Sequence, residues 1–175
     1  MDVGVDEAVT PVDPSFDDWV EARAAALLRF AYLVTGSQQD AEDAVQSALA
    51  RACEKWSRVR RADDPDAYVR RMVVNAHVSR WRRSGRRELS VAEVRDSTVG
   101  DPADALARDD AVWRVCSALP RQQRAAVVLR FYEDLEYAEI AALLGVSEVA
   151  VRSYVHRALV SLRAELTQED TDGRR

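Results

Sequence analysis

The sequence predicts an all-α protein made of two small helical domains joined by a flexible acidic linker. Apolar residues recur at spacings of three and four along most of the chain, which is the period of helices that bury one face. Residues 88–108 break this pattern: they lack a helical period and carry more acidic than basic side chains. The chain of 175 residues is long enough for two small domains, which we place at residues 15–87 and 109–166.

Three helices are expected in the first domain. Ser15 and Asp18 have the spacing of a capping box, and Ser37 with Asp40 is expected to begin the second helix. A polar loop over residues 57–64 ends in Asp64-Pro65, an N-cap before Pro, so the third helix should run to Ser84 with Gly85 after it. The residues expected to face inward are Trp19, Ala26, Leu27, Phe30, Leu33 and Val34 in the first helix and Ala41, Ala44, Val45, Ala48, Leu49 and Ala52 in the second.

The second domain should contain a helix that ends near Ala118, a helix from Pro120 to Phe131, and a helix pair over residues 135–162. The composition of residues 1–14 predicts a disordered leader. Residues 167–175 are polar and are expected to form a frayed tail.

Residues 135–162 have the pattern of a helix-turn-helix. Gly145 can adopt positive φ at low cost, Val146 fills the angle between the helices, and Ser147 is a good N-cap for the second. This geometry sets a recognition helix in the major groove of DNA. The alternative is an ordinary helical hairpin with a solvated outer face. The candidate DNA-facing residues are Ser147, Glu148, Arg152, Ser153, His156 and Arg157.

Positive charge is concentrated in one segment, although the whole chain has a net charge of −5. Residues 58–87 hold ten Arg and three Asp, interleaved with Tyr68 and Trp81. Arginine binds phosphates, aromatic rings stack on unpaired bases, and Asn75 and His77 can hydrogen-bond base edges. The segment therefore suits single-stranded or melted DNA. The alternative is that Tyr68, Trp81 and Val73 belong to the core while the arginines are solvated.

Other function classes find little support in the sequence. Cys53 and Cys116 lack metal-ligand spacing and are interpreted as small buried side chains, so we expect neither a metal nor a cofactor. The best candidate for catalysis, Cys53 with His77, lacks an orienting group, so we expect no enzyme. The chain has no signal-peptide pattern and no apolar run of membrane-spanning length, so we expect a cytoplasmic protein without a membrane partner.

The second helix has a polar outer face made by Asp40, Asp43, Gln46 and Ser47. Taken alone, this face is as expected for a solvated helix surface. The alternative is that this face contacts a protein partner.

Four motifs in order resemble those of bacterial RNA polymerase sigma factors of the sigma-70 family. They are residues 40–46 (DAEDAVQ), 65–75 (PDAYVRRMVVN) and 119–124 (LPRQQR), followed by the helix-turn-helix. The chain most resembles the short extracytoplasmic-function (ECF) group over about residues 15–166. Its single Lys against 24 Arg is similar to the actinobacterial sigma-E branch.

The resemblance implies a first domain (region 2) that docks on the β′ clamp helices of core polymerase and opens the −10 promoter element. By motif match the docking surface holds Asp40, Asp43, Gln46 and Ser47. The loop over residues 59–64 and the helix beneath it would capture non-template bases. The −10 contacts implied in this way are Arg58, Arg60, Arg61, Arg70, Arg71, Asn75 and Arg80.

The second domain (region 4) would, by the same resemblance, dock on the β flap and read the −35 element through the helix-turn-helix. The acidic linker would thread toward the RNA exit path. Many members of the family are held inactive by an anti-sigma protein. Ala150 and Tyr154 depart from the family's usual Thr or Ser and Arg, so the promoter sequence does not transfer from relatives. The alternative function is a stand-alone helix-turn-helix regulator of duplex operators.

Overall fold

The computed structural model describes residues 14–85 and 116–172, and every regular element in these two ranges is helical. This agrees with the predicted all-α class. The leader before Pro14 and the linker at 88–108 lie outside the described residues, as does most of the helix predicted to end near Ala118.

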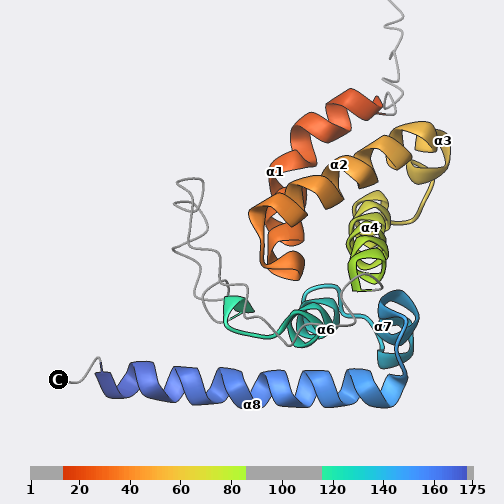
Figure 1. The fold of residues 1–175 in the computed structure, drawn as a ribbon. Coiled ribbons are helices and arrows are strands. Elements are labelled where there is room, and N and C mark those ends of the chain that lie inside the picture. The colour runs from red at the N-terminus through yellow and green to blue at the C-terminus, as the bar shows by residue number, and fades with distance from the viewer. Residues whose placement is uncertain (1–13, 86–115, 173–175) are drawn as a thin grey trace, which may run out of the picture.

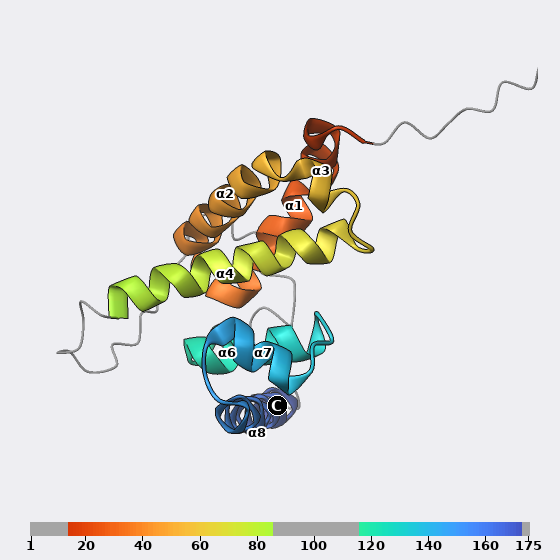
Figure 2. The ribbon, with the colours of Figure 1, turned by 90° about the vertical axis from the view of Figure 1, so that its right-hand side faces the viewer.

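The first domain is built around α4, as Figure 2 shows. α1 and α2 pack on each other and both contact α4, while the short α3 closes the corner between α2 and α4. Ser15 and Asp18 form the predicted capping box, and the amide of Ala67 donates to the Asp64 carboxylate over 2.8 Å at the start of α4. The four helices are α1 (Phe16–Thr35), α2 (Gln38–Glu54), α3 (Trp56–Val59) and α4 (Pro65–Gly85).

The second domain lies below the first in Figure 1, with the long α8 along its base. α6 and α7 both pack on α8, and α7 follows α6 after a short turn. Its helices are α6 (Arg121–Phe131), α7 (Tyr137–Leu144) and α8 (Glu148–Asp172).

The two domains share one hydrophobic core. The same buried cluster contains Phe30 and Val73 of the first domain and Leu129, Ile140 and Val151 of the second. Contacts between α1 and α6 and between α4 and α7 join the domains. The sequence predicted two tethered domains and gave no sign that they would pack together.

Two predicted inward residues are exposed. Ala26 faces solvent because the buried stripe of α1 is centred on Leu27, Ala31 and Val34, and Ala26 lies beyond its edge. Cys53 is exposed because it is rotated about 100° from Ala52, which is fully buried.

Two segments predicted to be irregular are helical. Residues 57–59 lie in α3, whose Trp56 ring packs edge-on against Phe16, with 5.5 Å between ring centroids, and whose Val59 is fully buried. The burial of these side chains favours a helical turn over an open loop. At the other end, α8 continues to Asp172, so the predicted tail is helical over residues 167–172.

None of the helices in the described ranges is long and apolar enough to cross a membrane. The same residues contain no group of three or more His, Cys, Asp or Glu side chains placed to hold a metal ion.

Candidate nucleic-acid interface

The helix-turn-helix forms as the sequence predicts. Gly145 ends α7 with φ of 65°, and its amide donates to the carbonyl of Ala141 over 2.8 Å. The amide of Ala150 donates to the hydroxyl of Ser147 over 3.2 Å, so Ser147 caps α8. Val151 and Val155 are buried, which fixes the opposite face of α8 toward solvent.

The polar face of α8 presents most of the predicted DNA-facing side chains. Arg152, His156 and Arg157 are exposed, whereas Glu148 and Ser153 are half-buried. Glu148 lies 2.5 Å from the Arg152 guanidinium, which sits 5.4 Å from the centroid of the Tyr137 ring. Both contacts restrict the conformation of the Arg152 side chain in the free protein.

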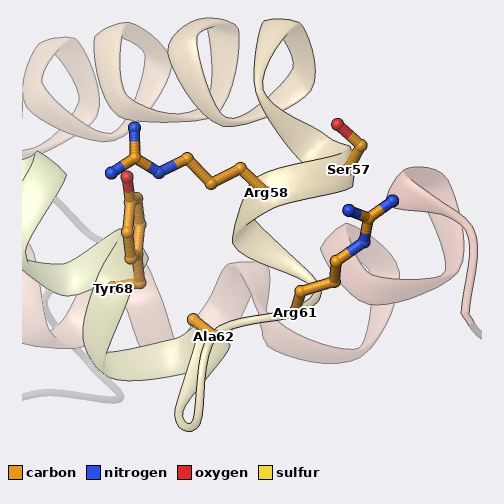
Figure 3. A pocket seen from close by; sticks show the side chains of 5 residues that line it. All are labelled: Ser57, Arg58, Arg61, Ala62 and Tyr68. Atoms are coloured by element: carbon orange, nitrogen blue, oxygen red, sulfur yellow. The ribbon is translucent and has the colours of Figure 1, made fainter.

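A cationic hollow lies at the corner of α3 and α4. Figure 3 shows Arg58 reaching across to the hydroxyl end of Tyr68, while the Arg61 side chain runs the other way, toward Ser57. The hollow has a volume of about 370 Å³ and is completed by Ser57 and Ala62. It combines two guanidinium groups with one aromatic wall, which is the chemistry that holds an unpaired base and its phosphates.

Two side chains of α4 that were predicted to touch bases have different environments. Asn75 is exposed and available. His77 is buried against the second domain, so in this structure it does not lie on the exposed surface where the sequence placed it. Burial lowers the pKa of His77 below its ordinary value of 6.5, against the opposing effect of Asp40, and this favours the neutral imidazole.

The two candidate stacking aromatics, Tyr68 and Trp81, are both half-buried. Tyr68 packs against the core with one side and lines the hollow with the other. Trp81 shares a small crevice with Leu144, Val146 and Tyr154 of the second domain. Tyr154, where the sequence departs from the pattern of the family it resembles, therefore lies at the contact between the domains.

Among the arginines predicted to contact the −10 element, Arg70, Arg71 and Arg80 are engaged in ion pairs. Arg70 pairs with Glu133, and Arg71 lies 3.5 Å from Glu139, both across the domain boundary. Arg80 donates to Asp43 on α2, and this hydrogen bond raises its pKa. Arg58, Arg60 and Arg61 are exposed.

The predicted docking face of α2 is largely open to solvent. Gln46 and Ser47 are exposed, and Asp43 is half-buried beside Arg80. Asp40 is the most covered of the four, with Arg80 at 4.0 Å and Arg121 of the second domain at 3.9 Å.

Comparison with known proteins places both domains in one family. Residues 19–87 match sigma-70 region 2, and residues 109–162 match sigma-70 region 4. The chain is 36% identical to the RNA polymerase sigma-E factor of Streptomyces coelicolor, over 91% of this chain and 90% of that protein. The chain belongs to the ECF group of the sigma-70 family of RNA polymerase sigma factors.

Further relatives agree with this assignment. The sigma factor is 32% identical to the ECF RNA polymerase sigma factor SigM of Mycobacterium tuberculosis, over 85% of this chain and 75% of that protein. Its fold resembles that of the sigma factor RpoE from Bartonella quintana, solved with the anti-sigma factor NepR, with a TM-score of 0.56, 22% identity, and coverage of 87% and 96% of the two chains.

Two residues that make extensive contacts in the sigma factor were not among the candidates predicted from the sequence. Arg124 is buried in α6 and donates four hydrogen bonds to carbonyl oxygens, one of them in region 2. The sequence signal that could have revealed its burial is its position directly before the apolar run at residues 125–129. Glu133, in the turn after α6, gave no periodic signal, because its partner Arg70 is 63 positions away.

Proposed function

We propose that this sigma factor docks on core polymerase through the outer face of α2 and contacts promoter DNA with both regions. As a member of its family it directs promoter-specific transcription initiation. The observation that supports the residue assignments is the presence of two separate surfaces with exposed cationic side chains. One is the hollow at the α3–α4 corner, and the other is the polar face of α8. A stand-alone regulator of duplex DNA would need only the second.

The proposed docking surface consists of Asp40, Asp43, Gln46 and Ser47 and contacts the β′ clamp helices. Its support is that Gln46 and Ser47 are exposed while the opposite side of α2 is buried in the core. Polar side chains on one open helix face suit a protein interface with matching polar groups. Region 4 is proposed to dock on the β flap.

The proposed −10 surface centres on the hollow at the α3–α4 corner. Arg58 and Arg61 would bind phosphates of the non-template strand, and Tyr68 would stack on an unpaired base. Asn75 on the same helix is exposed and would hydrogen-bond a base edge. The other residues proposed for the −10 surface are Arg60, Arg70, Arg71 and Arg80.

The proposed −35 surface is the exposed face of α8. Arg152 points from the first turns of the recognition helix, where helix-turn-helix proteins contact base edges. His156 and Arg157 follow one turn later and are exposed. Ser147, Glu148 and Ser153 lie beside them, with Ser147 and Glu148 also holding the start of the helix in place.

The remaining assignments follow from this role. The protein performs no catalysis of its own, because the polymerase carries out the chemistry. It acts in the cytoplasm, where its relatives' polymerase is found, and it takes an anti-sigma protein as a further partner, as the Bartonella quintana relative does. Residues 15–87 and 109–166 form the two functional regions, and 88–108 connect them.

The test is transcription in vitro with core polymerase over genomic fragments. We expect discrete start sites that depend on the added protein, co-elution with core in gel filtration, and loss of −35-dependent initiation in Arg152→Ala. Gln46→Arg should weaken core binding more than about tenfold. Ala25→Arg, which adds the same charge at an exposed site on α1, should leave it unchanged. A chain that neither co-elutes nor initiates would refute the function.

A further inference from the structure

The first turn of the recognition helix carries an exposed valine. Val149 is the second residue of α8, and 77% of its surface is open to solvent, the largest fraction among the exposed large apolar side chains of the described residues. A single exposed apolar side chain is ordinary on a protein surface. The position of Val149 on the helix therefore decides which role it can have.

Val149 belongs to the open face of α8. Val151, two positions further on, is fully buried, and it lies about 200° around the helix from Val149. Residues three, four and seven positions apart share one face of a helix. Val149 therefore shares its face with Arg152 and His156, which are exposed, and with Ser153, which is half-buried. All three were assigned to the −35 surface, and Val149 is the apolar side chain among them.

The start of α8 has a defined orientation in the helix-turn-helix. The hydroxyl of Ser147 accepts from the amide of Ala150 over 3.2 Å, and the Arg152 guanidinium is held between Glu148 and the Tyr137 ring. Helix-turn-helix proteins contact base edges with the first residues of the recognition helix. A side chain at the position of Val149 would therefore enter the major groove together with that of Arg152.

The chemistry of a valine selects one feature of the major groove. Base edges present hydrogen-bond donors and acceptors there, and the apolar group among them is the 5-methyl group of thymine. Valine has neither donor nor acceptor in its side chain, so it would leave a polar base edge without a partner and without water, which is unfavourable. Against a thymine methyl group it buries apolar surface on both sides. Val149 thus favours thymine over the other three bases.

We propose that Val149 is a specificity-determining residue of the −35 surface and contacts the 5-methyl group of one thymine. The proposal rests on the assignment of α8 as the reader of the −35 element. Three residues separate Val149 from Arg152, which is about 4.5 Å along the helix axis. Base pairs follow one another at about 3.4 Å. The thymine therefore lies within about two base pairs of the pair that Arg152 reads.

The test removes the methyl group from the DNA and the valine from the protein. Each thymine of the −35 element found by transcription in vitro, on either strand, is replaced in turn by deoxyuridine, which lacks only the 5-methyl group. Holoenzymes are assembled with the starting protein, with Val149→Ala and with Val160→Ala. Val160 is the matched control, because it is another exposed valine of α8 and lies eleven residues further along, beyond the residues assigned to DNA. Circular dichroism checks that both variants fold.

The readout is the affinity of each holoenzyme for each promoter fragment. With the starting protein and with Val160→Ala, deoxyuridine at one thymine should weaken binding about fourfold, the effect of one buried methyl group. Val149→Ala should bind the unmodified fragment more weakly and should not distinguish thymine from deoxyuridine at that position. The sensitive thymine should lie within about two base pairs of the pair whose sequence preference is lost in Arg152→Lys.

Three results would overturn the contact. They are a −35 element without thymine, equal binding of every deoxyuridine fragment, and the same sensitivity to deoxyuridine in Val149→Ala as in the starting protein. Initiation from the unmodified template would leave the proposed function intact in each case. Loss of co-elution with core polymerase in Val149→Ala would place the valine against a protein and would also overturn the contact. If the starting protein initiates from no template, the function falls and the contact falls with it.

Discussion

The Nη1 atom of Arg124 donates a hydrogen bond to the carbonyl oxygen of Thr35 over 2.9 Å, joining the start of α6 to the end of α1. The other donors of the same guanidinium reach the carbonyls of Cys116, Ser117 and Leu119. Within the described residues no carboxylate pairs with Arg124, and burial lowers the pKa of its guanidinium. Carbonyl dipoles, including that of the last turn of α1, stabilise the cation instead.

We expect Arg124→Met to destabilise the protein by about 2–4 kcal/mol, because buried carbonyl oxygens lose their donor. The methionine fills a similar volume, so the loss reports hydrogen bonds rather than a cavity. Urea denaturation followed by circular dichroism measures it. A loss below about 1 kcal/mol would show that water satisfies these carbonyls in the absence of the guanidinium.

Gly36→Ala tests the same contact from the side of region 2. Gly36 has φ of 71°, and a Cβ there would lie 1.3 Å from Nη1 of Arg124. The substitution combines backbone strain with displacement of a bonded guanidinium. We expect a loss of about 2 kcal/mol or more in the free energy of unfolding.

Gly145→Ala is the matched control for Gly36→Ala. Its φ is 65°, and its Cβ would meet the guanidinium of Arg82, whose exposed side chain can move. We expect about 1 kcal/mol from backbone strain alone. Equal losses at the two glycines would contradict a specific role for Arg124 at the boundary between the regions.

The cap of the recognition helix offers a further prediction. Ser147→Ala removes the acceptor of the Ala150 amide and should cost about 1 kcal/mol. Ser161→Ala, at an exposed position on the same helix, should change stability by less than about 0.5 kcal/mol. Thermal unfolding of the two variants side by side gives the comparison.

Stability should depend on pH through His77. Because its pKa is lowered in the folded protein, the unfolded chain binds the proton more readily. The stabilisation is present above about pH 6.5 and is lost as the pH falls toward the lower pKa of the folded state. Besides Asp40, the charged groups around His77 are Arg121, Arg124 and Arg80.

The measurement is the free energy of unfolding of the starting protein and of His77→Gln between pH 7.5 and 5.5. The starting protein should lose stability relative to the variant as the pH falls. Burial raises the pKa of Glu133, which acts in the opposite direction, but this contribution is common to both proteins and cancels in the difference. If the difference in free energy of unfolding between the two proteins does not change with pH, His77 is not the source of the pH dependence.

Local sequence signals predicted most of the helices and the outer face of the recognition helix. Caps such as Ser15, Asp64 and Ser147 are decided by residues within one turn, so spacing alone reveals them. The pairing of Arg70 with Glu133 is decided by how two domains pack. No periodicity records such a contact.

The burial of His77 illustrates the same limit within one helix. A polar residue in an Arg-rich helix was interpreted as facing DNA, and it instead lies against the second domain, near Arg121 and Tyr154. The face of α4 that holds it is buried because region 4 covers it. The sequence of region 2 alone therefore could not distinguish the two outcomes.

The shared core has a consequence for how this protein and its relatives diverge. Side chains such as Phe30 and Ile140 belong to a single packed cluster, although they come from the two parts of the chain that match sigma-70 regions 2 and 4 separately. A change of volume in one region must be accommodated by the other. Chimeras that join region 2 of this chain to region 4 of a distant relative should therefore lose stability as isolated proteins, so the two regions are expected to evolve as a matched pair.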